Sequence, residues 1–230
     1  MNYKLLSIIV PVYNEESTIA EVIQRIKATD LPLKKEIIVI DDGSSDRTKS
    51  ILEADKEITN LYLTPVNVGK GAAVRIGLTL VKGDIILIQD ADLELDPNEY
   101  RNLLEPIFQN KTKVVYGSRF LKNNNEVPFL RVLANRSLTF ITNRLFKSNL
   151  TDMETAYKVF TSEVAKKLDL KANRFEIEPE ITARIGQMGY KITEIPISYN
   201  PRTKSEGKKI NWRDGVKAVW MLTKCYFDKK

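Results

Sequence analysis

Short apolar runs that end in acidic residues recur along the first half of the chain, and they constrain its fold more than any other feature. Residues 37–40 are all apolar and lead into Asp41, and residues 85–88 are all apolar and lead, by way of one glutamine, to Asp90. Segments with helical periodicity, such as 70–81, separate these runs. Apolar strands that alternate with helices predict an α/β fold, with a mostly parallel sheet flanked by helices on both faces.

The same patterns set the bounds of the expected elements. Strands are predicted over residues 6–12, 36–41, 61–64, 84–89, 114–116 and 191–198. Helices are predicted over residues 16–27, 46–54, 70–81, 97–108, 129–146, 177–188 and 211–227, with an asparagine-rich linker over 122–127. The chain has 230 residues, of which 43% are hydrophobic, and this suits one compact domain over residues 1–230.

Polar motifs follow several of the predicted strands at the point where each strand ends. These motifs are 13–15 after the first strand, 41–43 after the second, 90–92 after the fourth and Arg119 after the fifth. Ligands of open α/β sheets bind outside the carboxyl ends of the strands. We therefore expect these side chains to meet at one rim of the sheet.

Asp90, Ala91 and Asp92 form an Asp-x-Asp motif directly after an apolar strand. Two carboxylates in this position suit a divalent cation that is shared with a diphosphate. The chain contains no histidine, so a metal would need oxygen ligands, which favours Mg²⁺ or Mn²⁺. Asp-x-Asp is also common in surface turns, but the apolar strand before it and Glu94 after it favour the metal site.

Asp41 and Asp42 end a buried strand, so they must face solvent or a hydrogen-bond donor. Nucleobase N–H groups and ribose hydroxyls are such donors, and both acids are therefore candidates for binding a nucleoside. The alternative is a local turn, in which Asp46 caps the helix that follows.

Basic residues on the same rim are candidates for binding phosphate. Lys70 lies in the glycine-rich segment 67–71, which is either a phosphate-binding loop or a helix start packed on the sheet. Arg119 is either a salt-bridge partner or a phosphate clamp, and the downstream Arg131 and Arg136 favour the clamp.

Segment 200–209 is polar and basic, and it follows the last predicted strand. This composition suits a lid, in which Arg202 and Lys208 close over a diphosphate. A solvated loop explains the composition equally well.

The formal net charge of +6 allows several anionic partners, but basic residues interleaved with aromatic ones are missing, which argues against nucleic acid. No stretch approaches the roughly 20 apolar residues that a membrane-spanning helix needs. The helix at 211–227 carries tryptophan and lysines, which suits either a membrane surface or packing on the sheet. The single cysteine, Cys225, fits a reducing compartment.

The ordered set of motifs resembles family 2 glycosyltransferases with the GT-A, Rossmann-like fold, and within them the polyprenyl- or dolichyl-phosphate mannose synthase branch. The resemblance covers essentially the whole chain, and it is carried by PVYNEE, DDGSSD, NVGKGAA, QDADLELDP, GSRF, TDMETAYKVF, FEIEPEI and PISYNPRTKSEGKKI. It implies inverting transfer of a single hexose, mannose or glucose, from GDP-mannose or UDP-glucose to a polyprenyl or dolichyl phosphate.

The resemblance also implies roles for individual residues. Residues 1–120 would bind the nucleotide sugar, and residues 121–230 would bind the acceptor and supply the C-terminal amphipathic helix. Asp92, Arg119 and Arg131 would carry catalysis. Pro11, Tyr13, Glu15 and Asp42 would line the nucleoside, Asp90, Asp92 and Glu94 would surround the metal, Arg119 and Arg131 would hold the acceptor phosphate, and Arg202 the donor diphosphate.

A lipid phosphate is already anionic near neutral pH, so its attack needs positioning and charge stabilisation rather than a strong base. If the acceptor is instead the hydroxyl of a glycan or glycolipid, Asp152 and Glu154 are the candidate bases; otherwise they are exposed acids near a helix or turn. A nucleotide-sugar-binding subunit without activity is a third possibility, against which both aspartates of the metal site argue. We expect peripheral attachment to the cytoplasmic face of a membrane, with room for a membrane-protein partner or a homodimer.

Overall fold

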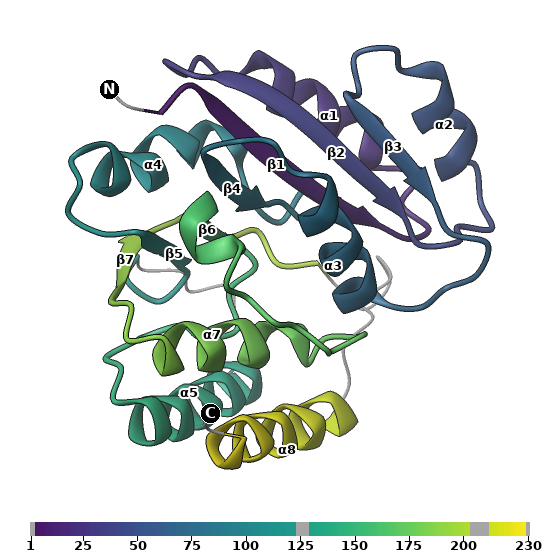
Figure 1. Ribbon diagram of the computed structural model, residues 1–230. Coiled ribbons are helices and arrows are strands. Elements are labelled where there is room, and N and C mark those ends of the chain that lie inside the picture. The colour runs from purple at the N-terminus through teal and green to yellow at the C-terminus, as the bar shows by residue number, and fades with distance from the viewer. Residues whose placement is uncertain (1–2, 123–128, 203–211, 229–230) are drawn as a thin grey trace.

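The computed structural model describes residues 3–122, 129–202 and 212–228. Seven strands form one sheet in the order β3-β2-β1-β4-β6-β5-β7, and helices lie on both of its faces (Figure 1). The strands are β1 (Leu5–Val12), β2 (Lys34–Asp41), β3 (Asn60–Leu63), β4 (Ile85–Ile88), β5 (Val114–Ser118), β6 (Lys158–Thr161) and β7 (Ile192–Pro196). The predicted α/β class and the mostly parallel sheet are confirmed.

The helices follow the predicted order, with one division and one addition. They are α1 (Ile19–Ala28), α2 (Thr48–Ala54), α3 (Lys70–Leu80), α4 (Tyr100–Phe108), α5 (Phe129–Phe146), α6 (Ser162–Ala165), α7 (Ile177–Gln187) and α8 (Trp212–Phe227), with a short 3-10 helix at Pro97–Glu99 before α4. The predicted helix 97–108 is divided into the 3-10 turn and α4, and α6 is not predicted by the sequence patterns. The predicted linker over 122–127 lies almost wholly outside the described residues.

Strand β6 departs from the parallel pattern and was missed by the sequence analysis. It runs antiparallel to both β4 and β5 and joins them into one sheet. The strand has only four residues and begins with a lysine, Lys158, whose side chain is fully buried. A lysine normally marks an exposed position, so the hydrophobic pattern gave no strand signal here.

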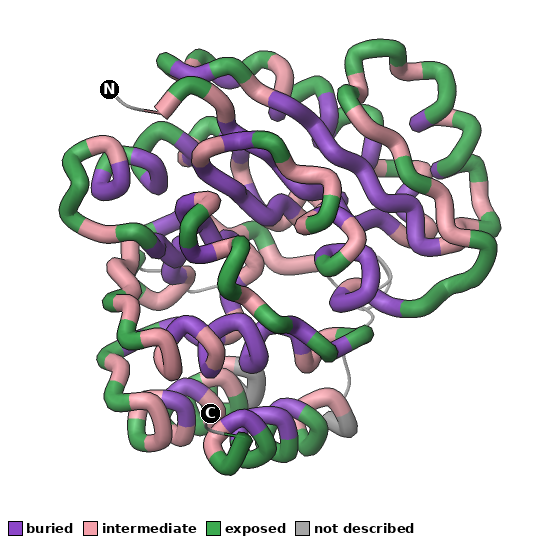
Figure 2. Tube along the Cα trace, in the orientation of Figure 1, coloured by how far each residue is buried: buried purple, intermediate pink, exposed green. Residues whose placement is uncertain are grey.

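Alternation along the strands divides the core between the two faces of the sheet. Leu6, Ile8 and Val10 of β1 pack in the cluster that includes α1 and α4, whereas Ile9 packs against α3 on the opposite face. The central strands are buried on both faces, as Figure 2 shows by their purple trace. This double burial explains why β1, β2 and β4 read as continuous apolar runs rather than alternating ones.

A layer of helices extends the core away from the sheet. Helix α7 belongs to the core cluster on the α3 face, and α5 and α8 pack against α7 and against each other (Figure 1). Helix α8 contributes Met221, Leu222 and Cys225 to this cluster. The second half of the chain therefore adds a third layer and does not form a separate core.

Local hydrogen bonds shift the start of two predicted helices. The helix predicted from residue 16 begins at Ile19, because the amides of Thr18 and Ile19 both donate to the carbonyl of Glu15 and form a turn. The helix predicted from residue 46 begins at Thr48, whose amide donates to the Asp46 carboxylate at 2.9 Å.

Two helical glycines should respond in opposite directions to substitution by alanine. A Cβ atom on Gly77 of α3 would lie 2.5 Å from Cγ2 of the buried Ile9, whereas a Cβ on Gly215 of α8 would meet nothing within 4 Å. We expect Gly77→Ala to lower the free energy of unfolding by roughly 1–2 kcal/mol, since overpacking outweighs helix propensity. Gly215→Ala should raise it by about 0.5–1 kcal/mol. Urea denaturation checks both, and equal signs would contradict the packing of α3 on β1.

Candidate active site

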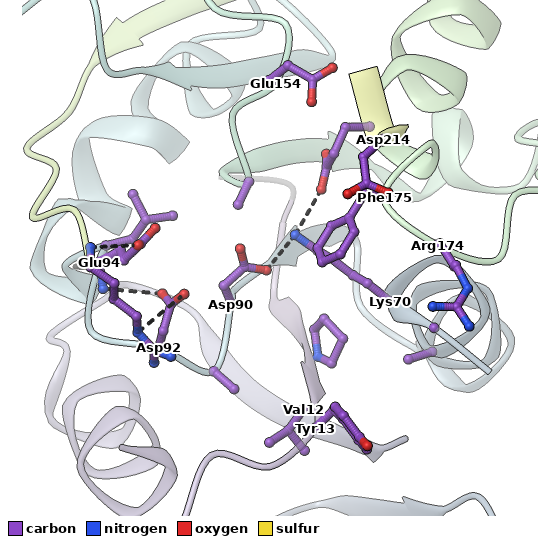
Figure 3. A pocket seen from close by; sticks show the side chains of 18 of the residues that line it. Val12, Tyr13, Lys70, Asp90, Asp92, Glu94, Glu154, Arg174, Phe175 and Asp214 are labelled. Carbon is purple, nitrogen blue, oxygen red and sulfur yellow. Dashed lines mark hydrogen bonds and ion pairs between the residues drawn. The ribbon is translucent and has the colours of Figure 1, made fainter. Parts of the chain in front are cut away.

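A cavity of about 760 Å³ opens where β1, β2 and β4 end (Figure 3). Its volume lies within the roughly 300–1,000 Å³ of typical ligand pockets. The expected convergence of the strand-end motifs is confirmed, because most of the predicted site residues line this cavity. They are Pro11, Tyr13, Glu15, Asp42, Lys70, Asp90, Ala91, Asp92, Glu94, Arg119 and Arg202.

Four of the predicted site residues are not brought to the cavity wall by the described structure. Asp41 is buried and its Oδ1 accepts a hydrogen bond from the Ser44 amide at 3.1 Å, so it supports the turn. Arg136 is exposed on α5 and does not line the cavity. The side chain of Arg131 and the whole of Lys208 lie outside the described residues.

The two aspartates of the Asp-x-Asp motif lie in different electrostatic surroundings. Lys70 Nζ lies 2.6 Å from Asp90 Oδ1 and neutralises that carboxylate. Asp92 has no comparably close cation, since Arg202 Nε is 3.9 Å away. Burial, with Asp90 and Glu94 nearby, raises the pKa of Asp92 to about 7, and Arg202 only partly opposes this. A cation bound beside Asp92 would therefore favour its ionised form.

A buried chain of charges fixes Lys70 from behind. Glu178 of α7 accepts from Lys70 Nζ at 2.9 Å and also from the fully buried Lys158 of β6. Burial raises the pKa of Glu178, but Lys158 and Lys70 outweigh this and hold it at about 2. Glu178 lies in the FEIEPEI motif, but the sequence alone gave it no individual role. Its pairing partners are 108 and 20 residues away in sequence, so no local pattern could reveal them.

Segment 199–202 forms part of the cavity wall through Tyr199 and Arg202. The guanidinium of Arg202 forms a bidentate pair with Glu15, with distances of 3.1 and 2.7 Å. Glu94 accepts from the Arg202 amide and from the Tyr199 hydroxyl, each at 2.9 Å. Both carboxylate oxygens of Glu94 thus accept one hydrogen bond each, and each keeps a lone pair for a cation.

Asp42 holds the loop that leads into α3. Its carboxylate accepts from the amides of Gly69 at 2.7 Å and Val68 at 2.8 Å, and from the Asn67 side chain at 2.9 Å. Gly69 has φ of 117°, a backbone region that glycine adopts readily, directly before Lys70. Asp42 lines the cavity and at the same time orders the start of the helix that carries Lys70.

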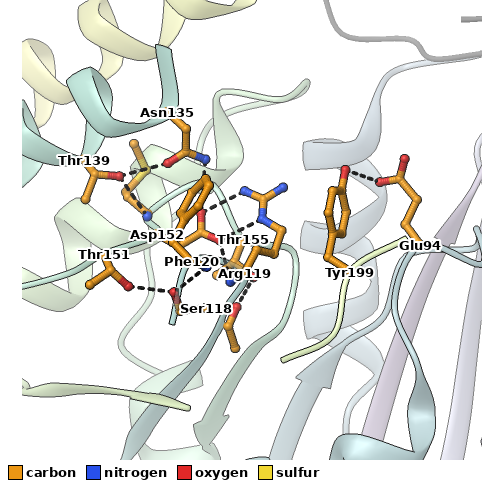
Figure 4. A network of polar contacts seen from close by, with 12 residues as sticks. Glu94, Ser118, Arg119, Phe120, Asn135, Thr139, Thr151, Asp152, Thr155 and Tyr199 are labelled. Carbon is orange, nitrogen blue, oxygen red and sulfur yellow. Dashed lines mark hydrogen bonds and ion pairs between the residues drawn. The ribbon is translucent and has the colours of Figure 1, made fainter. Parts of the chain in front are cut away.

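Arg119 is held by a buried carboxylate, as Figure 4 shows. Asp152 accepts from Arg119 Nε at 2.7 Å, from Nη2 at 2.8 Å and from the backbone amide at 3.0 Å. The prediction that Asp152 is exposed is wrong, since its side chain is fully buried. Burial raises the pKa of Asp152, but Arg119 outweighs this and lowers it. A carboxylate so engaged is a poor general base, and its role is to fix Arg119 at the cavity wall.

The described residues fit a divalent cation that binds together with an anionic ligand. Eight acidic side chains line the cavity against four basic ones, an excess of negative charge that alone would repel a diphosphate. No three acidic side chains of the described ranges already converge as a complete metal shell. Mg²⁺ usually binds through one or two carboxylates of the protein together with phosphates of the substrate. Asp92 and Asp90 can provide the carboxylates.

Comparisons with known proteins agree with this geometry. The family model described as glycosyl transferase family 2 matches residues 7–169. Dolichyl-phosphate beta-glucosyltransferase ALG5A of Trichomonas vaginalis is 29% identical over 95% of this chain and 72% of its own length. Dolichol-phosphate mannosyltransferase of Pyrococcus furiosus is 30% identical over 88% of this chain and 58% of its own length.

A solved structure shows the same fold. Glucosyl-3-phosphoglycerate synthase of Mycobacterium tuberculosis, in complex with Mn²⁺, uridine diphosphate and phosphoglyceric acid, superposes with a TM-score of 0.74. The identity is 19%, and the match covers 98% of this chain and 79% of that one. The likeness confirms the GT-A fold that the motifs predicted.

Replacing Asp152 should expose how much stability its ion pair contributes. Asp152→Asn leaves Arg119 with an uncompensated buried charge, and we expect a loss of roughly 3–5 kcal/mol near neutral pH. The pKa of Asp152 is lowered by folding, so its stabilisation is complete above the unfolded value near 4 and is lost as pH falls through the folded value.

Urea denaturation at pH 7 and near pH 3 measures this difference. The difference in the free energy of unfolding between wild type and Asp152→Asn should be smaller near pH 3 than at pH 7. Glu163→Gln, which removes a half-exposed partner of Lys113, is the control and should change stability little at either pH. A gap that stays constant with pH would contradict an ionised Asp152.

Proposed function

The chain belongs to glycosyl transferase family 2, and from this we propose that it transfers one hexose from a nucleotide sugar to a polyprenyl or dolichyl phosphate. The donor would be GDP-mannose or UDP-glucose. The observation that carries the proposal is the arrangement of charge in the cavity. The acidic Asp90 and Asp92 line the same cavity as the basic Lys70, Arg119 and Arg202.

The donor would lie along the rim of the sheet. Pro11, Tyr13 and Asp42 line the end suited to the nucleoside, and the diphosphate would lie beside Asp92. Lys70 and Arg202 are each paired with carboxylates in the ligand-free protein. An incoming diphosphate would take over these cations as hydrogen-bond donors, at the expense of Asp90 and Glu15.

Bound Mg²⁺ or Mn²⁺ would offset the charge that grows on the departing nucleoside diphosphate. Asp92 and Asp90 are the residues suited to hold it, and Glu94, whose oxygens also accept from Tyr199 and Arg202, would be a third ligand. The solved M. tuberculosis structure contains Mn²⁺ and uridine diphosphate, which supports this assignment of the cofactor.

Arg119 would receive the acceptor phosphate. Asp152 fixes its guanidinium, and Tyr199 lies beside it with the ring centroid 5.1 Å from Cζ. A lipid phosphate oxygen needs no deprotonation, so positioning by Arg119, with Arg131 as a second arginine, would suffice. The T. vaginalis and P. furiosus relatives are named for transfer to dolichyl phosphate, which favours this acceptor over a hydroxyl.

Helices α5 and α8 supply a surface for the lipid bilayer. Helix α8 exposes Val216, Trp220 and Phe227, and Phe227 is 77% exposed. Lys224 lies over the Trp220 ring at 5.1 Å. Helix α8 thus presents apolar side chains to solvent, whereas Leu138, Ile141 and Leu145 of α5 pack inward.

No helix in the described part of the chain is long and apolar enough to span a bilayer. We therefore propose peripheral attachment to the cytoplasmic face, where a reducing environment suits the buried free thiol of Cys225. A membrane-protein partner or a second copy of the chain would occupy the same exposed face of α8.

Removal of Asp92 tests the transfer reaction. The purified protein, with Mg²⁺ or Mn²⁺, should move labelled mannose from GDP-mannose or labelled glucose from UDP-glucose to dolichyl phosphate. Asp92→Ala should lower this rate by roughly a hundredfold or more, because it removes charge that acts on the leaving diphosphate. EDTA should have a similar effect on the wild type.

The control is Asp169→Ala, since the Asp169 side chain is 75% exposed and does not line the cavity. Full activity in Asp92→Ala together with insensitivity to EDTA would rule out the metal site. Transfer to a glycan hydroxyl but not to the lipid phosphate would favour the second type of acceptor.

Vesicle flotation tests the proposed bilayer surface. The double substitution Trp220→Ser and Phe227→Ser should weaken binding to vesicles that contain phosphatidylserine by about tenfold or more, because each ring contributes buried apolar area. Binding should also weaken as salt rises, since lysines accompany the rings. Tyr62→Ser is the matched control, because Tyr62 is 46% exposed on β3, far from α8 in Figure 1. An equal loss of vesicle binding in both variants would show that α8 is not the membrane-binding surface.

A further inference from the structure

Glu154 lines the cavity, yet no step of the proposed transfer uses it (Figure 3). It lies in the segment between α5 and β6, two residues after Asp152. Its Oε1 atom is buried and has no hydrogen-bond partner among the described residues. This sets it apart from the neighbouring carboxylates of Asp152 and Glu178, which both hold basic side chains.

A buried carboxylate oxygen without a partner costs free energy that folding alone does not return. Such groups in native proteins call for an explanation, and they recur where a ligand supplies the missing partner. Substitution by an uncharged residue of similar size would remove this cost. Glu154 is therefore better suited to a bound molecule than to the stability of the fold.

The position of Glu154 narrows the choice of molecule. Four charged groups act on its carboxylate: Glu178 and Lys158, and also Arg119 and Asp152. Glu178 in turn holds Lys70, which contacts Asp90. Glu154 thus lines the same cavity as the residues of both proposed phosphate sites, and a hexose that passes from one phosphate to the other must cross this cavity.

The chemistry of a carboxylate selects among the groups that can reach this place. Burial raises the pKa of Glu154 to about 7, with Glu178 and Asp152 adding to the rise and Lys158 and Arg119 opposing it. A phosphate would be repelled by the ionised group. A sugar hydroxyl is a neutral donor and acceptor, so it can pair with either protonation state.

We propose that Glu154 recognises the hydroxyl groups of the donor hexose and so contributes to the choice of sugar. This inference rests on the proposed function, because it assumes that a nucleotide sugar occupies the cavity. One or two hydroxyls of the hexose would supply the partner that Oε1 lacks. The rest of the donor would keep its contacts with Asp92, Lys70 and Arg202.

Binding measurements on matched ligands test the assignment. Calorimetric titration with UDP and GDP, in the presence of Mn²⁺, first identifies the nucleotide that wild-type protein binds. The same nucleotide is then compared with its hexose conjugate in wild type, Glu154→Ala and Glu154→Gln. Glu53→Ala is the control, because Glu53 lies half-exposed on α2, away from the cavity.

We expect Glu154→Ala to weaken the binding of the nucleotide sugar by roughly tenfold or more. The affinity for the nucleoside diphosphate should stay within about twofold of wild type. Glu154→Gln should alter the ratio of affinities for sugars that differ in one hydroxyl. Thermal unfolding of Glu154→Gln should occur at the wild-type temperature or above it, since no internal hydrogen bond of Oε1 is lost.

Other outcomes would overturn the inference in distinguishable ways. Equal weakening of nucleotide and nucleotide sugar would show that Glu154 acts on the diphosphate or the fold. Unchanged affinity for the nucleotide sugar with lost transfer in Glu154→Gln would make it a general base instead. If neither nucleotide binds to wild-type protein, the proposed function itself fails and takes the sugar subsite with it.

Discussion

The fully buried ammonium of Lys158 is the interaction on which the site depends most. It is held by Glu178 and by the backbone carbonyls of Met153 and Thr155, and Glu178 passes the constraint to Lys70 and so to Asp90. Each of these charges is taken from water at a cost that only the neighbouring opposite charge offsets. The chain of charges therefore links β6, α7, the start of α3 and the end of β4. It sets where Asp90, the first aspartate of the proposed metal site, lies.

The same principle governs two other cationic groups of the cavity. Arg119 is paired with Asp152, and Arg202 with Glu15. Carboxylates thus hold these two cations in place at the cavity. Preorganised charges of this kind need little rearrangement when charge develops on a substrate. Asp92 is the exception, because its nearest cation is too distant to neutralise it fully.

Sequence reasoning predicted what is local and missed what is distant. The apolar runs of β1, β2 and β4 identified the sheet, and its topology brought Tyr13, Asp42, Asp90 and Arg119 together as expected. The partners of these residues could not be predicted, since Arg119 meets Asp152 and Lys70 meets Glu178 only through the fold. Strand β6 escaped detection because a lysine, not an apolar residue, occupies its first buried position.

The antiparallel insertion of β6 has a consequence for how the chain can be divided. Strands β4 and β5 do not pair with each other, and each meets β6 instead. A fragment of the first 120 residues would leave the edge of β4 open and β5 detached from the sheet, which are conditions that promote aggregation. The rim that carries the proposed nucleotide site is therefore not complete until the chain has been made up to residue 161. The candidate active site therefore completes its folding late, because it needs β6 from the second half of the chain.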